Sequence, residues 1–123
     1  MQLEGQGRID KPWGYELRWA ITDRYLGKII HVNAGHKLSL QYHEHKDESI
    51  FVLSGELDLV LEDDGGELRT HRLRAGESAR VHPGRRHRFV APVDVELVEV
   101  SSPEIDDVVR LEDDYGRAAS TPG

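Results

Sequence analysis

The sequence of 123 residues contains no cysteine, so it can form neither a disulfide, nor a thiolate metal site, nor a cysteine nucleophile. It has no apolar run long enough to cross a membrane, and its first ten residues lack the hydrophobic segment of a secretory signal. Basic residues are in the minority, with 16 Lys and Arg against 23 Asp and Glu. The net charge of −7 argues against a nucleic-acid-binding surface. We therefore expect a soluble, cytoplasmic protein whose partners include neither nucleic acid nor membrane.

Amphipathic helical patterns are absent between Gly27 and Val100. Short apolar segments fill this region instead, and Gly or Pro interrupts them about every 8 to 12 residues, which is typical of an all-β sandwich or barrel. The chain length suits one domain, residues 1–123, with the barrel at about 11–117 and a flexible C-terminal tail at 118–123. The predicted strands lie within residues 28–33, 38–45, 49–53, 57–62, 68–73, 78–82, 87–91 and 93–100.

Residues with metal-ligand chemistry gather in the second of these segments and beyond it. Strand alternation over 38–45 places Gln41, His43 and His45 on one face. Glu48 follows closely, and His87 comes after a Pro-Gly turn. Two imidazoles, a carboxylate and an amide oxygen suit one divalent ion such as zinc, manganese, iron, cobalt or nickel. His45 is equally consistent with a fifth ligand, an acid–base group or a residue at the barrel mouth, and surface histidines are the alternative to any metal site.

The spacing of these residues resembles the two motifs of the cupin superfamily. In the first motif, Gln41, His43 and Glu48 lie between Gly35 and Gly55, with every gap matched. In the second motif, His87 follows glycines at 76 and 84, although His replaces the usual Pro at 82 and Ala replaces Asn at 91. The resemblance implies a cupin fold, that is, a double-stranded β-helix or jelly-roll barrel, with Gln41, His43, Glu48 and His87 as metal ligands.

A narrower resemblance extends over residues 11–117, to the C-terminal cupin domain of type II mannose-6-phosphate isomerases. It rests on residues 10–16, 38–41, 52–55, 84–88 and 108–117. The sequence departs from that family at residues 43–46, which read His-Glu-His-Lys where three His and an Arg are usual, and at 49–50, where an aromatic-flanked His is missing. In that family the cupin domain is fused behind a guanylyltransferase domain. The 123 residues contain no Gly-rich phosphate loop, so we do not expect them to have guanylyltransferase activity.

The resemblance implies metal-dependent interconversion of an aldose phosphate and a ketose phosphate, with a sugar or sugar phosphate as the small-molecule partner. His45 and Glu99 are the first candidates for the catalytic base, followed by His36 and Lys37. Alternation along residues 95–100 places Glu99 on the same face as Val95 and Leu97, which makes it a buried carboxylate near the metal if that face is inward. A solvated strand Glu is the alternative. Lys11 and Arg117 are the preferred cations for the phosphate, because their surrounding motifs are otherwise unexplained. Further cations in the resembling segments are Lys37, Arg86, Arg88 and Arg110. A non-catalytic sugar- or metal-binding cupin and an iron cupin dioxygenase are the alternatives.

The exposed sheet edges of a small cupin favour pairing between subunits. We therefore expect a homodimer, in which the segment around residues 9–13 crosses to a partner barrel.

Overall fold

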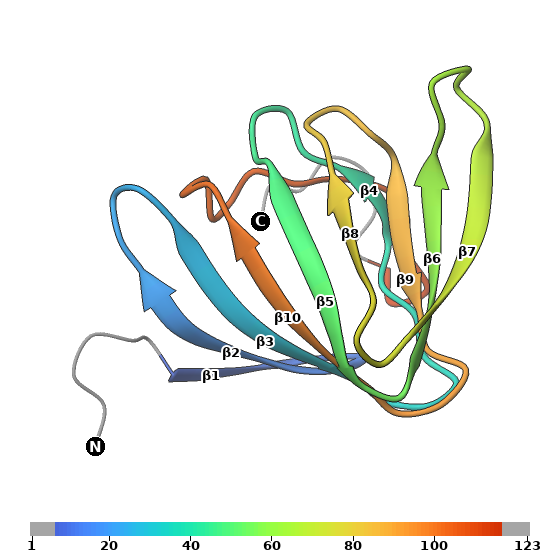
Figure 1. Cartoon of the computed structure of the whole chain (residues 1–123). Helices are drawn as coiled ribbons and strands as arrows, with labels where there is room; N and C mark the ends of the chain where they lie inside the picture. The colour runs from blue at the N-terminus through green and yellow to red at the C-terminus, as the bar shows by residue number, and fades with distance from the viewer. Residues whose placement is uncertain (1–6, 117–123) are drawn as a thin grey trace.

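The computed structural model describes residues 7–116, which form eleven strands and no helix. The strands build two antiparallel sheets that face each other (Figure 1). One sheet has the order β1-β2-β3-β10-β5-β8 and the other β11-β4-β9-β6-β7. The all-β prediction is confirmed. The strands are β1 (Gly7–Lys11), β2 (Gly14–Ile21), β3 (Leu26–Val32), β4 (Leu40–Tyr42), β5 (Glu48–Ser54), β6 (Glu56–Glu62), β7 (Leu68–Arg74), β8 (Ser78–Val81), β9 (His87–Val90), β10 (Val95–Ser101) and β11 (Val109–Glu112).

Among the described residues, none lies in a helix of the length and apolar character that a membrane span requires.

The inner faces of three neighbouring strands repeat one pattern along their length. On β3, β10 and β5, two apolar residues point into the core and a charged residue follows at the same end of the sheet. Register explains the alignment, because Glu99 pairs with Lys28 across β10 and β3. On β3 these residues are Val32 and Ile30, then Lys28. On β10 they are Val95 and Leu97, then Glu99, and on β5 they are Val52 and Ile50, then Glu48. The inner side of this sheet is therefore apolar toward one end of the strands and charged toward the other.

The predicted strand over residues 38–45 is too long. The strand covers only Leu40–Tyr42, and the chain then turns. The carboxylate of Asp107 accepts backbone hydrogen bonds from Glu44, His45 and Lys46 at 3.0, 2.7 and 2.9 Å. These N–H groups are therefore not available to a neighbouring strand. His45 is exposed, so the prediction that it shares a face with the metal ligands is wrong.

The turn between β1 and β2 gives the Lys-Pro-Trp-Gly-Tyr-Glu motif a structural role. Trp13 is buried in the core at 4% exposure. Gly14 has a φ of +154°, and a Cβ at this position would lie 2.0 Å from the backbone oxygen of His31. Only glycine therefore permits β2 to approach β3 this closely.

This close approach predicts that Gly14→Ala lowers the free energy of unfolding by about 3 kcal/mol, as other severe backbone clashes do. Gly35→Ala is the matched control. Gly35 also has a positive φ, +82°, but an added Cβ meets nothing within 4 Å. We expect it to cost only about 1 kcal/mol, the price of a left-handed conformation. Urea unfolding curves measure both values, and equal losses would contradict the clash.

The segment expected to cross to a partner barrel pairs within its own chain. Ile9 lies opposite Glu16 in the antiparallel ladder of β1 and β2. Strand β1 is nevertheless the edge of its sheet, with its outer side unpaired by any described residue. An exposed edge still favours strand addition.

The homodimer therefore stays a prediction. Light scattering at micromolar concentration should give twice the 14.0 kDa mass of the chain. A monomer mass would contradict it.

Candidate metal and sugar site

A cavity lies at the charged end of the interior, between the two sheets. Side chains from both sheets and from the segment before β11 line it. Its lining combines a few apolar side chains with an unusual number of charged ones. The lining residues are Lys11, Trp13, Glu16, Arg18, Lys28, Ile30, Leu38, Gln41, His43, Lys46, Glu48, Phe89, Glu99, Ile105, Asp107, Val108 and Arg110.

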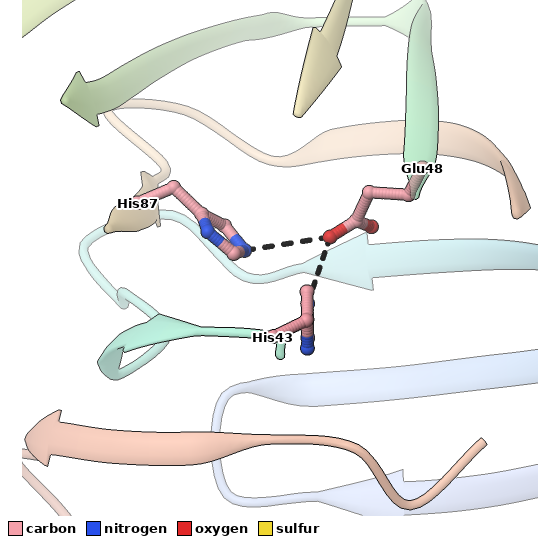
Figure 2. A group of neighbouring side chains, drawn as sticks. All are labelled: His43, Glu48 and His87. Carbon is pink, nitrogen blue, oxygen red and sulfur yellow. Dashed lines mark hydrogen bonds and ion pairs between the residues drawn. The ribbon is translucent and has the colours of Figure 1, made fainter. Parts of the chain in front are cut away.

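His43 and Glu48 of this lining lie next to His87 (Figure 2). One ligand atom from each lies within 4.8 Å of the others, and all three residues are buried. Nε2 of His43 is 2.9 Å from Oε1 of Glu48, and Nε2 of His87 is 3.4 Å from the same oxygen. Burial opposes the charge of Glu48, but the two neighbouring imidazoles and the charge of Lys46 hold its pKa well below the usual value. A carboxylate and two imidazoles thus point at one position.

In each imidazole ring, a hydrogen bond at Nδ1 determines that Nε2 is the nitrogen that faces Glu48. Nδ1 of His87 donates to the backbone oxygen of Arg85 at 3.0 Å, and Nδ1 of His43 donates to that of Asp107. In a neutral imidazole, Nε2 then carries a lone pair directed at Glu48. The buried Nε2 of His87 has no hydrogen-bond partner among the described residues. Metal-binding histidines show this same arrangement of a backbone carbonyl on the opposite nitrogen. The three side chains therefore fit a divalent cation, and the donor set suits a first-row transition metal.

Gln41 lines the same cavity from β4, where it pairs with His87 across the ladder to β9. Its Oε1 accepts a hydrogen bond from Ser39 Oγ at 2.7 Å, which leaves a second lone pair on that oxygen. Gln41 as a fourth ligand remains a prediction.

Glu99 and Lys46 form an ion pair beside the metal-binding group. Nζ of Lys46 lies 3.0 Å from Oε2 of Glu99, and the residues are 4% and 3% exposed. Burial and the neighbouring Glu48 raise the pKa of Glu99 to about 7, although Lys46 and Lys28 oppose the shift. The prediction that Glu99 shares the inner face with Val95 and Leu97 is confirmed in position.

A second charged group lies across the cavity, around Glu16. Its carboxylate contacts the side chains of Lys28 at 3.1 Å, Arg18 at 3.1 Å and Lys11 at 3.6 Å. Burial opposes the charge of Glu16, but the three cations still hold its pKa below the usual value. Lys11 therefore lies in the cavity, whereas Arg117 lies outside the described residues.

Four of these charged residues escaped the sequence reasoning: Glu16, Arg18, Lys28 and Lys46. Strand β2 shows why. Its apolar Leu17 and Trp19 are exposed at 36% and 49%, while Glu16, which points to the opposite face, is buried. The usual rule of apolar residues inside is inverted here. Lys28 could have been predicted to face the interior, because it alternates with Ile30 and Val32 on a strand whose apolar face is buried.

Comparison with known proteins places this site in a family. The family model described as mannose-6-phosphate isomerase C-terminal matches residues 2–113. The chain belongs to this family. Curated relatives include the alginate biosynthesis protein AlgA of Pseudomonas aeruginosa, 33% identical over 130 residues, and a mannose-1-phosphate guanylyltransferase of Escherichia coli, 35% identical over 129 residues. They cover 95% and 94% of this chain, which spans about a quarter of their length, 26% of each.

Solved structures confirm the cupin fold. KdgF from Halomonas sp. superposes with a TM-score of 0.70 at 24% identity, over 82% of this chain and 89% of that protein. An oxalate decarboxylase with Mn(II) centres from Bacillus subtilis reaches 0.74 at 18% identity, over 86% of this chain and 30% of that one. At these identities the likeness concerns the fold alone.

The geometry predicts one divalent ion per chain. Purified protein titrated with zinc or manganese should bind one equivalent, and its melting temperature should rise because the ion binds the folded state. Replacing His43 or His87 with Ala should abolish both effects.

His71→Ala is the matched control, because His71 is exposed on β7 and is not among the residues that line the cavity. It should keep the stoichiometry and the thermal shift. If the site variants bind metal as the wild type does, the assignment of the ligands is wrong.

Proposed function

We propose that this chain is a metal-dependent aldose–ketose isomerase that interconverts mannose 6-phosphate and fructose 6-phosphate or a close relative. The observation that supports this most strongly is the composition of one cavity. It contains a group able to hold a metal ion, a buried carboxylate with its own cation, and a cluster of cations. Family membership supports the same substrate class.

The reaction moves a proton between adjacent carbons through an enediol, so it needs three things from the protein. It needs stabilisation of the negative charge that develops on the substrate oxygens, a base beside the carbon, and a hold on the phosphate. A divalent ion held by His43, Glu48, His87 and Gln41 would supply the first by electrostatic attraction. The chain's own residues must supply the other two.

Glu99 is the base in this proposal. Its carboxylate faces the cavity, its backbone is fixed in the centre of a six-stranded sheet, and Lys46 holds one of its oxygens at 3.0 Å. Glu99 would take the proton from one carbon and return it to the next. His45 is less suited to this role because its side chain is exposed and absent from the cavity lining.

The proposal predicts that metal-loaded wild-type protein converts mannose 6-phosphate to fructose 6-phosphate. Glu99→Gln should lower kcat by about 10²-fold or more, as loss of a general base does. Metal stoichiometry should be unchanged, because Glu99 is not a proposed ligand. The coupled assay for fructose 6-phosphate and elemental analysis measure the two properties.

Glu96→Gln serves as the matched control. Glu96 lies on the same strand but points to the other face, where it contacts His31 at 3.4 Å. It should retain wild-type activity. A metal-loaded wild type that binds the sugar phosphate without turnover would instead assign the chain to the non-catalytic binding cupins.

A further inference from the structure

The group around Glu16 has an imbalance of charge. Lys11, Arg18 and Lys28 each contact the one carboxylate, at 3.6, 3.1 and 3.1 Å. Their side chains are 21%, 20% and 10% exposed, and that of Glu16 is 6% exposed. The carboxylate therefore balances one of three positive charges and leaves two. Buried charge without a partner is costly, so such an excess within a chain of net charge −7 requires an explanation.

Two further observations indicate that an anion belongs here. The buried Nε of Arg18 has no hydrogen-bond partner among residues 7–116, although such N–H groups are normally satisfied. Burial lowers the pKa of Lys11, and the charges of Arg18, Lys28 and Arg110 lower it further, against the pull of Glu16. Burial and the neighbouring cations thus oppose the positive charge of Lys11, and Glu16 supports it.

From this imbalance we infer that Lys11, Arg18 and Lys28 form the binding subsite for a phosphate monoester, with Glu16 as a built-in counter-ion that sets its charge. The inference rests on the proposed function and names how its substrate is selected. A phosphate monoester carries a charge of about −1.5 to −2 at pH 7, which matches the excess of two. A neutral sugar leaves the excess unbalanced, and a single carboxylate balances only half of it.

The position of this subsite fits a phosphorylated sugar that also reaches the metal-binding group. Arg18, Lys28 and Glu99 are directly paired across β2, β3 and β10. Glu48 lies one strand further, on β5. Three strand spacings separate β2 from β5, about 14 Å at the backbone, and long side chains project into the space between. The phosphate and the reacting carbons can therefore occupy opposite ends of one cavity, with Glu99 between them.

The counter-ion role of Glu16 predicts that removing a buried ion-pair partner improves binding. Glu16→Gln leaves three positive charges facing the phosphate, and we expect it to tighten the Kd of inorganic phosphate about tenfold. A single charge a few ångströms away in a partly buried site is worth this much. Without ligand the variant should melt at a lower temperature than wild type, and phosphate should raise its melting temperature by more. Lys28→Met should weaken phosphate binding about tenfold.

Phosphorus NMR titration of the full chain with inorganic phosphate measures these constants, and titration with mannose 6-phosphate should show changes of the same sign. The matched controls are Glu56→Gln and Arg72→Met. They make the same changes of charge in the exposed cluster on β6 and β7, where Arg72 contacts Glu56 at 3.2 Å. Both should bind phosphate as wild type does.

Opposite shifts in Glu16→Gln and Lys28→Met would support the subsite, and a gain in affinity cannot result from poor folding. Unchanged or weakened binding in Glu16→Gln, or unchanged binding in Lys28→Met, would overturn it. Phosphate binding needs no turnover, so the result is separate from the isomerase assay. A protein that shows the opposite shifts but no isomerisation would keep the subsite and lose the proposed reaction.

Discussion

The carboxylate of Glu48 lies where three parts of the chain meet, and it is 3% exposed. It extends from the first residue of β5 toward His87 at the start of β9 and His43 just after β4, so it joins the two sheets. Backbone carbonyls fix both imidazole rings from behind, which directs their Nε2 atoms at the same oxygen. The lone pair on Nε2 of a neutral imidazole repels the carboxylate oxygen. A cation bound between them would attract both and relieve this repulsion. The other charged side chains of the cavity lie around this group.

The other charges of the cavity extend in order from that point along the inner face of the larger sheet. Lys46 and Glu99 neutralise each other next to Glu48, and the cations around Glu16 follow beyond β3. Lys46 stands where the resembling family usually has Arg, and a lysine still supplies the charge while forming a single contact to Glu99. The sheet tolerates these charged side chains on its inner face because its strands are held together by backbone hydrogen bonds, which do not depend on the side chains. The cavity thus has the His43, Glu48 and His87 group at one end and the cations around Glu16 at the other.

The sequence contained enough to predict the fold and the three residues that converge at the metal site. His43, Glu48 and His87 were predicted because their spacing matches the two motifs of the cupin superfamily and their side chains have metal-ligand chemistry. The same spacing placed Gln41 at the cavity that it lines, and strand parity placed Glu99 on the inner face with Val95 and Leu97. His45 was misplaced because Asp107, sixty-two residues away, captures the backbone after β4 and ends the strand. The sequence around His45 gives no sign of this long-range contact.

Strands β1 and β2 could not be predicted from alternation for a related reason. On β2 the outward residues Leu17 and Trp19 are apolar and the inward ones Glu16 and Arg18 are charged, which is the reverse of the usual pattern. The inversion makes sense only once the cavity is known, because charged side chains on that face meet one another and not the apolar core. Charged residues that face the inside of a barrel therefore disrupt the apolar alternation by which a strand is recognised in the sequence.

The most direct test of this arrangement is the distance between metal and phosphorus in one complex. Manganese-loaded protein with bound mannose 6-phosphate can be measured through the paramagnetic relaxation of the phosphorus signal. The account predicts relaxation at a distance beyond direct coordination, with the phosphate among Lys11, Arg18 and Lys28 and the ion between His43, Glu48 and His87. A phosphorus atom coordinated directly to manganese, or one that manganese does not relax at all, would contradict it.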